Sequence, residues 1–223
     1  MRSATIWKFR DICFVSLIIF GASILAMPLL NIVCRNEKAV KYVFLLFWST
    51  ITLVTPALWI RRYYNLGKEA LGIGKGRWSV KSTVLIGVGA ALIFFFAELI
   101  IIRQKLDMTQ YSYNASKILS FTLSIDGFIT FLYGPIGEEI FFRGFLFGYM
   151  EGRLGFVLGL LLQAVIFGFL HFAISPAHAV SMLFHGSLIG ISCGILYKSS
   201  DSLYPAIIFH CALNFFVTVA KIG

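Results

Sequence analysis

The chain has little charge for its size. Only 13% of its 223 residues are charged, whereas 59% are hydrophobic. A soluble domain carries about 25% charged residues, so this composition excludes an ordinary soluble protein. The sequence predicts an integral membrane protein of single-domain length.

Several familiar signatures are missing. The chain has no H-E-x-x-H zinc helix, no G-x-S-x-G nucleophile elbow and no second aspartate motif beside Asp126. It also shows no inverted repeat, which argues against a transporter. The few cysteines lack C-x-x-C spacing, so we predict that they are small core residues: Cys13, Cys34, Cys193 and Cys211.

Seven apolar runs are each long enough for a spanning helix, which needs about 20 residues. They cover Ile12–Cys34, Tyr42–Ile60, Ser82–Ile102, Leu119–Met150, Gly155–Phe172, Ala177–Tyr197 and Leu203–Ala220. The fourth is too long for one straight crossing, and Gly134-Pro135 predicts a kink within it. We therefore predict an all-α, polytopic membrane bundle of about seven transmembrane helices.

The net charge of +9 has two readings, nucleic-acid binding or membrane topology. The basic residues lie in loops between apolar runs, so we predict the positive-inside pattern and no nucleic-acid partner. With the N-terminus inside, the inside segments hold eleven Lys and Arg, against seven outside. The most basic loop, Arg61–Lys81, contains several glycines, and we predict a flexible cytoplasmic connection touching anionic headgroups.

Besides Asp126, the fourth apolar run contains three charged side chains close together: Glu138, Glu139 and Arg143. Each charge at that depth costs about 3 kcal/mol on insertion scales, so unpaired groups there are usually functional. Glu139 and Arg143 are four apart, on one helical face, and are predicted to pair. Glu138 points elsewhere, and a lone desolvated carboxylate suits a general base.

A histidine on the fifth run is predicted to lie level with Glu138. The fourth and fifth runs form a hairpin whose turn is expected near Gly152–Gly155, and Glu138 and His171 are equally far from it. Residues equally far from such a turn share a depth in the membrane. We therefore expect Glu138 and His171 to meet around one water molecule.

His210 and Asn214, four apart on the seventh run, form the remaining polar pair. An imidazole and an amide can donate hydrogen bonds to an oxyanion. The constellation predicts peptide hydrolysis by an activated water without a metal. A zinc-dependent version stays open, with Glu138, His171 and His210 as ligands and a fourth position free.

Other polar side chains in or near the apolar runs are given structural roles. We expect His178 to lie in a turn and His185 to stand alone on an apolar helix. Glu98, near the end of the third run, is expected to reach the membrane interface.

Three motifs in order, Glu138-Glu139-x-x-x-Arg143, Phe167-x-x-x-His171 and His210-x-x-x-Asn214, resemble those of the CPBP family. These are the CAAX-protease and bacteriocin-processing, or Abi, intramembrane endopeptidases. The resemblance covers about Ser120 to Ala220. It divides the chain into residues 1–118, with N-terminal transmembrane helices and the basic loop, and residues 119–223, a CPBP-like catalytic core, within one integrated domain.

The resemblance implies an endopeptidase of membrane-associated proteins or peptides, with or without a prenyl group. Carried over by motif, Glu138 and His171 activate water, Glu139 and Arg143 support them, and His210 with Asn214 holds the oxyanion. The compact chain with short loops and its loop charges lead us to expect a multi-pass protein of a bacterial cytoplasmic membrane with the N-terminus inside. The alternative of another class is a non-enzymatic immunity or scaffold factor.

Overall fold

The computed structural model describes residues 6–34, 36–103, 115–174 and 179–222, and these ranges contain helices and no β-strand. The predicted all-α class is confirmed. The helices outside the central segment are α1 (Phe9–Val33), α2 (Glu37–Tyr64), η1 (Lys68–Leu71), α3 (Val80–Arg103), α4 (Ala115–Thr122), α8 (Phe156–Ile174), α9 (Ala179–Ser200) and α10 (Tyr204–Ile222).

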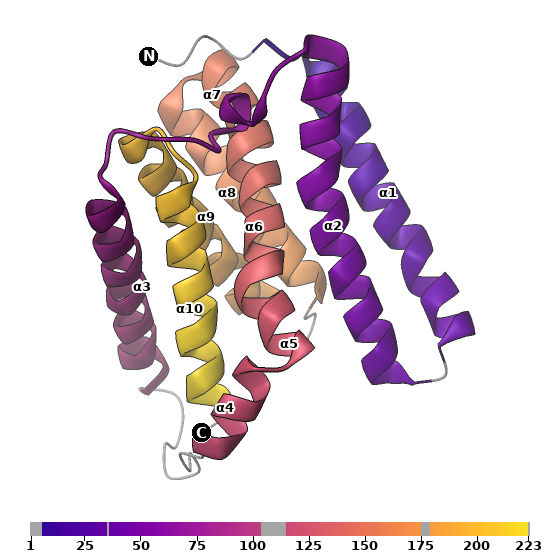
Figure 1. The fold of residues 1–223 in the computed structure, drawn as a ribbon, viewed down its shortest axis with the longest axis vertical. Helices are drawn as coiled ribbons and strands as arrows, with labels where there is room; N and C mark the ends of the chain where they lie inside the picture. The colour runs from indigo at the N-terminus through magenta and orange to yellow at the C-terminus, as the bar shows by residue number, and fades with distance from the viewer. Residues whose placement is uncertain (1–5, 35, 104–114, 175–178, 223) are drawn as a thin grey trace.

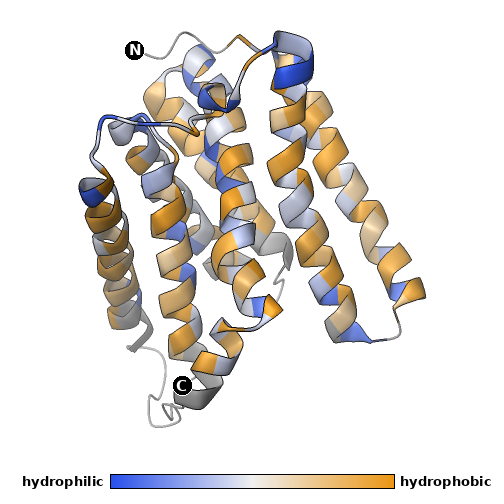
Figure 2. Cartoon of the chain, viewed as in Figure 1, coloured by the Kyte–Doolittle hydropathy of each residue, from blue (hydrophilic) through white to orange (hydrophobic). Residues whose placement is uncertain are grey.

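Among the residues that the structure describes, three helices are long and apolar enough to cross a membrane, over Phe9–Val33, Ala39–Tyr64 and Val80–Glu98. Two shorter apolar helices cover Phe156–Leu170 and Tyr204–Ala220. In Figure 2 apolar residues run along the helices, while hydrophilic residues gather at helix ends and at a few interior points of α6 and α10. The predicted helical membrane bundle is confirmed, and the number of seven crossings stays a prediction.

A single rod forms the middle of the bundle. It joins α5 (Ile125–Phe128), the π-helix η3 (Ile129–Tyr133), α6 (Gly134–Glu139), the π-helix η4 (Ile140–Phe147) and α7 (Gly148–Leu154). Figure 1 shows α6 between α2 and α10, with α8 and α9 behind. All eight residues of η4 are buried. The predicted charged segment therefore occupies the centre of the protein.

The sequence predicted a kink at Gly134-Pro135 within the span Leu119–Met150. In the structure the helix breaks earlier in this span. The helix is interrupted at Leu123–Ser124, where the Ser124 hydroxyl accepts a hydrogen bond from the Gly127 amide at 3.1 Å and begins α5. It continues through Pro135, which stands in the first turn of α6. The wider π-helical turns of η3 lie directly before Pro135, where a regular helix would press the proline ring against a carbonyl.

Two glycines on the rod allow close packing. A methyl group at Gly137 would lie 2.6 Å from both the Ser49 carbonyl oxygen and the Thr52 hydroxyl of α2. One at Gly144 would lie 2.6 Å from the carbonyl oxygen of Leu71 in η1. Any side chain would push these elements apart, so the two glycines bring residues of the first half against the rod.

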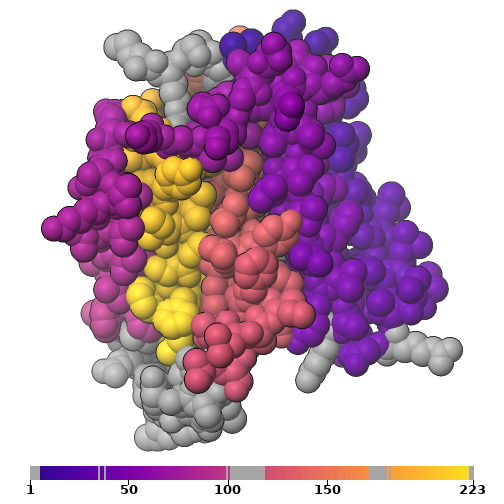
Figure 3. Space-filling model, in the orientation of Figure 1, coloured from indigo at the N-terminus to yellow at the C-terminus, as the bar shows by residue number. Residues whose placement is uncertain are grey.

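The connection between α2 and α3 is tied down, which corrects the prediction of a flexible loop. The Arg77 amide donates to the Ser200 carbonyl at 2.7 Å, and its guanidinium pairs with Asp201 at 2.5 Å. The Leu203 amide donates to the Gly72 carbonyl at 3.0 Å. Figure 3 shows the connection lying across one end of the molecule. The turn between α9 and α10 thus holds the basic loop in place.

Candidate active site

Glu139 and Arg143 form a fully buried ion pair in the rod. The Arg143 Nη1 donates to Glu139 Oε1 at 2.8 Å, and neither side chain has any exposed surface. The guanidinium carbon also lies 4.3 Å from the centre of the Phe167 ring of α8, a cation–π contact. The predicted pairing of the two side chains is confirmed. The charge of Glu139 is compensated inside the protein.

His210 of α10 lies between the two glutamates. Its Nδ1 is 2.8 Å from Glu139 Oε1, the same oxygen that accepts from Arg143. A carboxylate paired with a guanidinium only accepts hydrogen bonds, so Nδ1 is the donor and carries the proton. The other ring nitrogen, Nε2, lies 3.8 Å from Glu138 Oε2. That separation is too long for a direct hydrogen bond.

Glu138 has a different environment from its neighbour. Its side chain is 21% exposed, whereas that of Glu139 is fully buried. Its Oε1 accepts a hydrogen bond from the indole Nε1 of Trp48 at 3.3 Å. Its Oε2 faces His210 across the 3.8 Å gap. Glu138 therefore keeps capacity to bind a further molecule, as a water-activating group requires.

The sequence did not reveal Trp48 as a neighbour of Glu138. The two residues are ninety positions apart, and Trp48 sits among apolar residues of α2 with no motif around it. The one usable signal is general, because an indole N–H in an apolar helix needs a hydrogen-bond partner. That signal does not say which partner.

Asn214 turns toward the rod but not toward Glu139. Its Nδ2 donates to the carbonyl oxygen of Thr130 in η3 at 3.0 Å. His210 and Asn214 share a face of α10, yet their hydrogen bonds go to different partners. One of the two amide N–H groups of Asn214 is engaged by the main chain. The other is the one that an oxyanion could use.

The side chain of His171 lies outside the described part of the structure, so its predicted meeting with Glu138 stays a prediction. The hairpin itself is as expected: α7 ends at Leu154, Gly155 adopts a φ of 79°, and α8 begins at Phe156. Phe167, four residues before His171 on α8, contacts the edge of the His210 ring, with centroids 5.8 Å apart.

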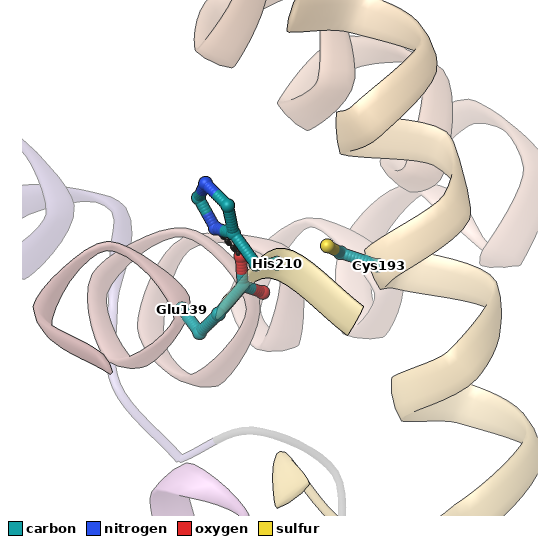
Figure 4. A group of neighbouring side chains, drawn as sticks. All are labelled: Glu139, Cys193 and His210. Atoms are coloured by element: carbon teal, nitrogen blue, oxygen red, sulfur yellow. Dashed lines mark hydrogen bonds and ion pairs between the residues drawn. The ribbon is translucent and has the colours of Figure 1, made fainter. Parts of the chain in front are cut away.

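Cys193 of α9 joins the buried cluster, as Figure 4 shows. One potential metal-binding atom from each of Glu139, Cys193 and His210 lies within 4.8 Å of the others. Carboxylate, thiol and imidazole are zinc ligands in kind. However, Glu139 already accepts from His210 and from Arg143, whose positive charge repels a cation. This set fits a metal poorly, and Cys193 remains the buried core residue that the sequence predicted.

The alternative zinc site predicted from the sequence has other ligands, namely Glu138, His171 and His210. Of its three ligands, Glu138 and His210 present Oε2 and Nε2 to each other, 3.8 Å apart. Zinc–ligand distances of about 2 Å would fit between these atoms. The third, His171, has a side chain outside the described residues. The part of this set that the structure describes is compatible with zinc.

Three predictions concern residues outside the central cluster: His185, Glu98 and His178. His185 does not stand alone, because its Nδ1 pairs with Glu98 of α3. Both side chains are about one-fifth exposed, so Glu98 contacts the bundle rather than only the membrane interface. His178 lies outside the described residues. The His185–Glu98 pair links α9 to α3 away from the central cluster.

The fold and this cluster define a class: a helical membrane protein in which acidic and basic groups of a central rod meet an imidazole from a neighbouring helix. The family described as "Type II CAAX prenyl endopeptidase Rce1-like" matches residues 120–216. The Bacillus subtilis (strain 168) protein named "Putative membrane peptidase YdiL" is 27% identical over 184 residues, covering 78% of this chain and 71% of that one. No solved structure matches significantly.

These matches confirm the resemblance of the chain to the CPBP family. The matched range contains all six predicted site residues, and it excludes Trp48. Together the two matches support a membrane-bound protease.

Proposed function

We propose that the protein is an intramembrane endopeptidase that hydrolyses peptide bonds with a water molecule activated by Glu138 and His171, while His210 and Asn214 hold the oxyanion. The observation that carries this proposal is the pair of facing atoms, Glu138 Oε2 and His210 Nε2, 3.8 Å apart. A water molecule bound to Oε2 would therefore lie next to a substrate oxygen bound to Nε2, as attack on a carbonyl carbon requires. The family match supplies the reaction class.

In the proposed reaction Glu138 takes a proton from the water while the hydroxide oxygen bonds to the substrate carbonyl carbon. His171, on the neighbouring helix, shares in orienting this water. The carbonyl oxygen becomes an oxyanion, and the carbon–nitrogen bond then breaks. The leaving nitrogen takes the proton back from Glu138. No covalent intermediate with the protein is needed.

His210 and Asn214 are proposed to hold the oxyanion. Glu139 fixes the His210 ring through Nδ1, and Arg143 fixes Glu139. Nε2 is then the ring atom that faces the substrate, and an N–H at this position would donate to the oxyanion. The remaining N–H of Asn214 is the second donor. Donors fixed in advance need no reorganisation during the reaction.

A metal-dependent version of the same protease is the second candidate. Glu138, His171 and His210 would hold the zinc, which when bound would polarise the substrate carbonyl and activate water. We favour the metal-free version. Metal analysis of protein purified without chelator decides between them. About one zinc per chain, together with loss of cleavage after chelation and recovery on zinc addition, would overturn our preference.

We propose a membrane protein or membrane-bound peptide as substrate, with or without a prenyl group, since the matched family is named for CAAX prenyl proteins. We further propose a bacterial cytoplasmic membrane with the N-terminus inside. The basic α2–α3 connection, the α7–α8 turn and the α9–α10 turn lie at the end of the bundle where α1 begins (Figure 1). Positive residues collected at one end favour that end as cytoplasmic.

The test compares cells that carry the wild-type protein with cells that carry Glu138→Ala, using mass spectrometry of protein termini. New termini present only with the wild-type protein are expected within or beside membrane-embedded segments. The purified protein should then cleave peptides spanning those positions. If no terminus depends on Glu138 and Glu138→Ala cells retain the biological effect, the protein is a non-enzymatic factor instead.

A further inference from the structure

Among the described residues, the first half of the chain contributes one polar contact to the proposed site. Trp48 lies on α2, outside the range that matches the family, and its Nε1 donates to Glu138 Oε1 at 3.3 Å. Among the described residues, Trp48 is the one side chain that makes a hydrogen bond to the side chain of Glu138. This hydrogen bond is therefore a candidate for a role in the reaction as well as in packing.

Packing holds the indole of Trp48 in place. Its ring lies 5.8 Å from the Phe20 ring of α1, and Phe20 lies edge-on to Phe141 of η4 at 6.1 Å. The close approach of α2 to Gly137 brings this face of α2 beside Glu138. The indole ring is thus packed against Phe20, which in turn packs against the rod.

The Glu138 carboxylate, by contrast, needs an external partner to fix its rotation. The last side-chain torsion of glutamate has a broad energy profile, so the carboxylate turns easily when nothing holds it. An indole bonded to Oε1 leaves Oε2 directed at His210 Nε2. Without the indole donor the carboxylate could rotate, and Oε2 would no longer point at His210 Nε2. A displaced catalytic group slows the reaction strongly.

We propose that Trp48 is a positioning residue, which orients the Glu138 carboxylate through this one hydrogen bond. The inference rests on the proposed function, because orientation matters only if Glu138 activates water. It assigns a role in the reaction to a helix of the first half of the chain. Trp48 touches neither the water nor the substrate in this scheme.

The kinetic test is Trp48→Phe, which keeps an aromatic ring and removes the donor. We expect kcat to fall about tenfold, as for loss of one hydrogen bond to a charged group, with KM changed less than about twofold. Trp59→Phe is the matched control, because Trp59 on the same helix donates to Asp11 Oδ1 at 3.2 Å, away from the site. This control should keep wild-type kcat and KM.

A second measurement does not require activity. In ¹⁵N-labelled protein the indole N–H resonances of Trp48 and Trp59 are assigned with the two Phe variants, or by selective labelling if Trp48→Phe does not fold. Glu138→Gln should shift the Trp48 resonance and leave that of Trp59 unchanged. If the Trp48 resonance keeps its chemical shift in Glu138→Gln, the inference is wrong.

The outcomes separate the inference from the function on which it rests. If wild-type protein cleaves, Glu138→Gln does not, and Trp48→Phe retains full kcat, Trp48 has no positioning role and the proposed function stands. If Glu138→Gln cleaves like the wild type, the proposed function fails and the inference fails with it. A selective fall in kcat together with the selective resonance shift supports both.

Discussion

Two carboxylates in this protein accept an indole N–H from the same helix, α2, yet their surroundings differ. Asp11, at the start of α1, accepts from Trp59 at 3.2 Å, from the Lys8 amide at 2.6 Å and from the Tyr64 hydroxyl. Glu138 accepts from Trp48 at 3.3 Å and faces His210 across a gap. The Asp11 side chain is 4% exposed, whereas the Glu138 side chain is 21% exposed.

The comparison separates a structural carboxylate from one with capacity for chemistry. Three donors around Asp11 use most of its hydrogen-bonding capacity and join the start of α1 to the end of α2. At Glu138 one oxygen is anchored and the other remains available for a water molecule. A carboxylate whose partners are incomplete inside a membrane bundle is costly, so such a group indicates function more strongly than a saturated one does.

The largest expected effect is on cleavage by Glu138→Gln. Removal of a general base typically lowers the rate by about 10² to 10⁴-fold. The free energy of unfolding should change by less than about 1 kcal/mol, because Gln keeps the size of Glu and the indole contact. Both are measured on purified protein, by peptide cleavage and by denaturant unfolding in micelles.

Asp11→Asn is the matched control for Glu138→Gln and should behave in the opposite way. It should keep full cleavage and lose about 1–3 kcal/mol of stability, because buried donors lose a charged acceptor. If Asp11→Asn abolished cleavage in a folded protein, the division between the two carboxylates would be wrong.

The next effect concerns the buried ion pair behind the site. Arg143→Met should destabilise the protein by about 3–5 kcal/mol, since Glu139 would remain buried without its cation. The double variant Glu139→Gln/Arg143→Met should recover much of that loss while remaining inactive, because no uncompensated charge is left. SDS-induced unfolding of both variants measures this difference. If Arg143→Met were as stable as the wild type, the claim that Arg143 compensates the buried charge of Glu139 would be wrong.

Gly137→Ala tests the close approach that brings Trp48 to Glu138. The new methyl group would lie 2.6 Å from backbone and side-chain atoms of α2, so we expect a loss of about 1–3 kcal/mol and lower cleavage. Gly89→Ala is the control, because nothing lies within 4 Å of a methyl group there. In a helix that change should be neutral or slightly stabilising. Thermal unfolding in micelles compares the two.

The sequence predicted features that depend on spacing along one helix or one hairpin. The Glu139–Arg143 pair follows from a separation of four, and the turn at Gly155 follows from the ends of two apolar runs. The charged residues in an apolar run also indicated the position of the site. Burying a charge in the membrane costs free energy however the helices are arranged. These are local or energetic arguments that need no knowledge of which helices become neighbours.

Contacts between distant helices were not predictable in this way. Trp48 meets Glu138, and Cys193 lies beside Glu139, only because α2 and α9 pack on the rod. His210 was expected to face the oxyanion with Asn214, and nothing in its spacing indicated that Nδ1 binds Glu139. The ordered α2–α3 connection depends on the α9–α10 turn, more than a hundred residues away. Each of these features depends on how the helices are arranged in space.

The smallest expected effect comes from removing one of several donors to the saturated carboxylate. Tyr64→Phe takes away one hydrogen bond to Asp11 and leaves those from Trp59 and the Lys8 amide. We expect a loss of about 1 kcal/mol in unfolding free energy and unchanged cleavage, because two donors still satisfy the carboxylate. At Glu138, where one indole anchors the group, removal of that donor is expected to slow catalysis instead. A slowing of cleavage by Tyr64→Phe as large as that by Trp48→Phe would mean that the two carboxylates differ in position but not in role.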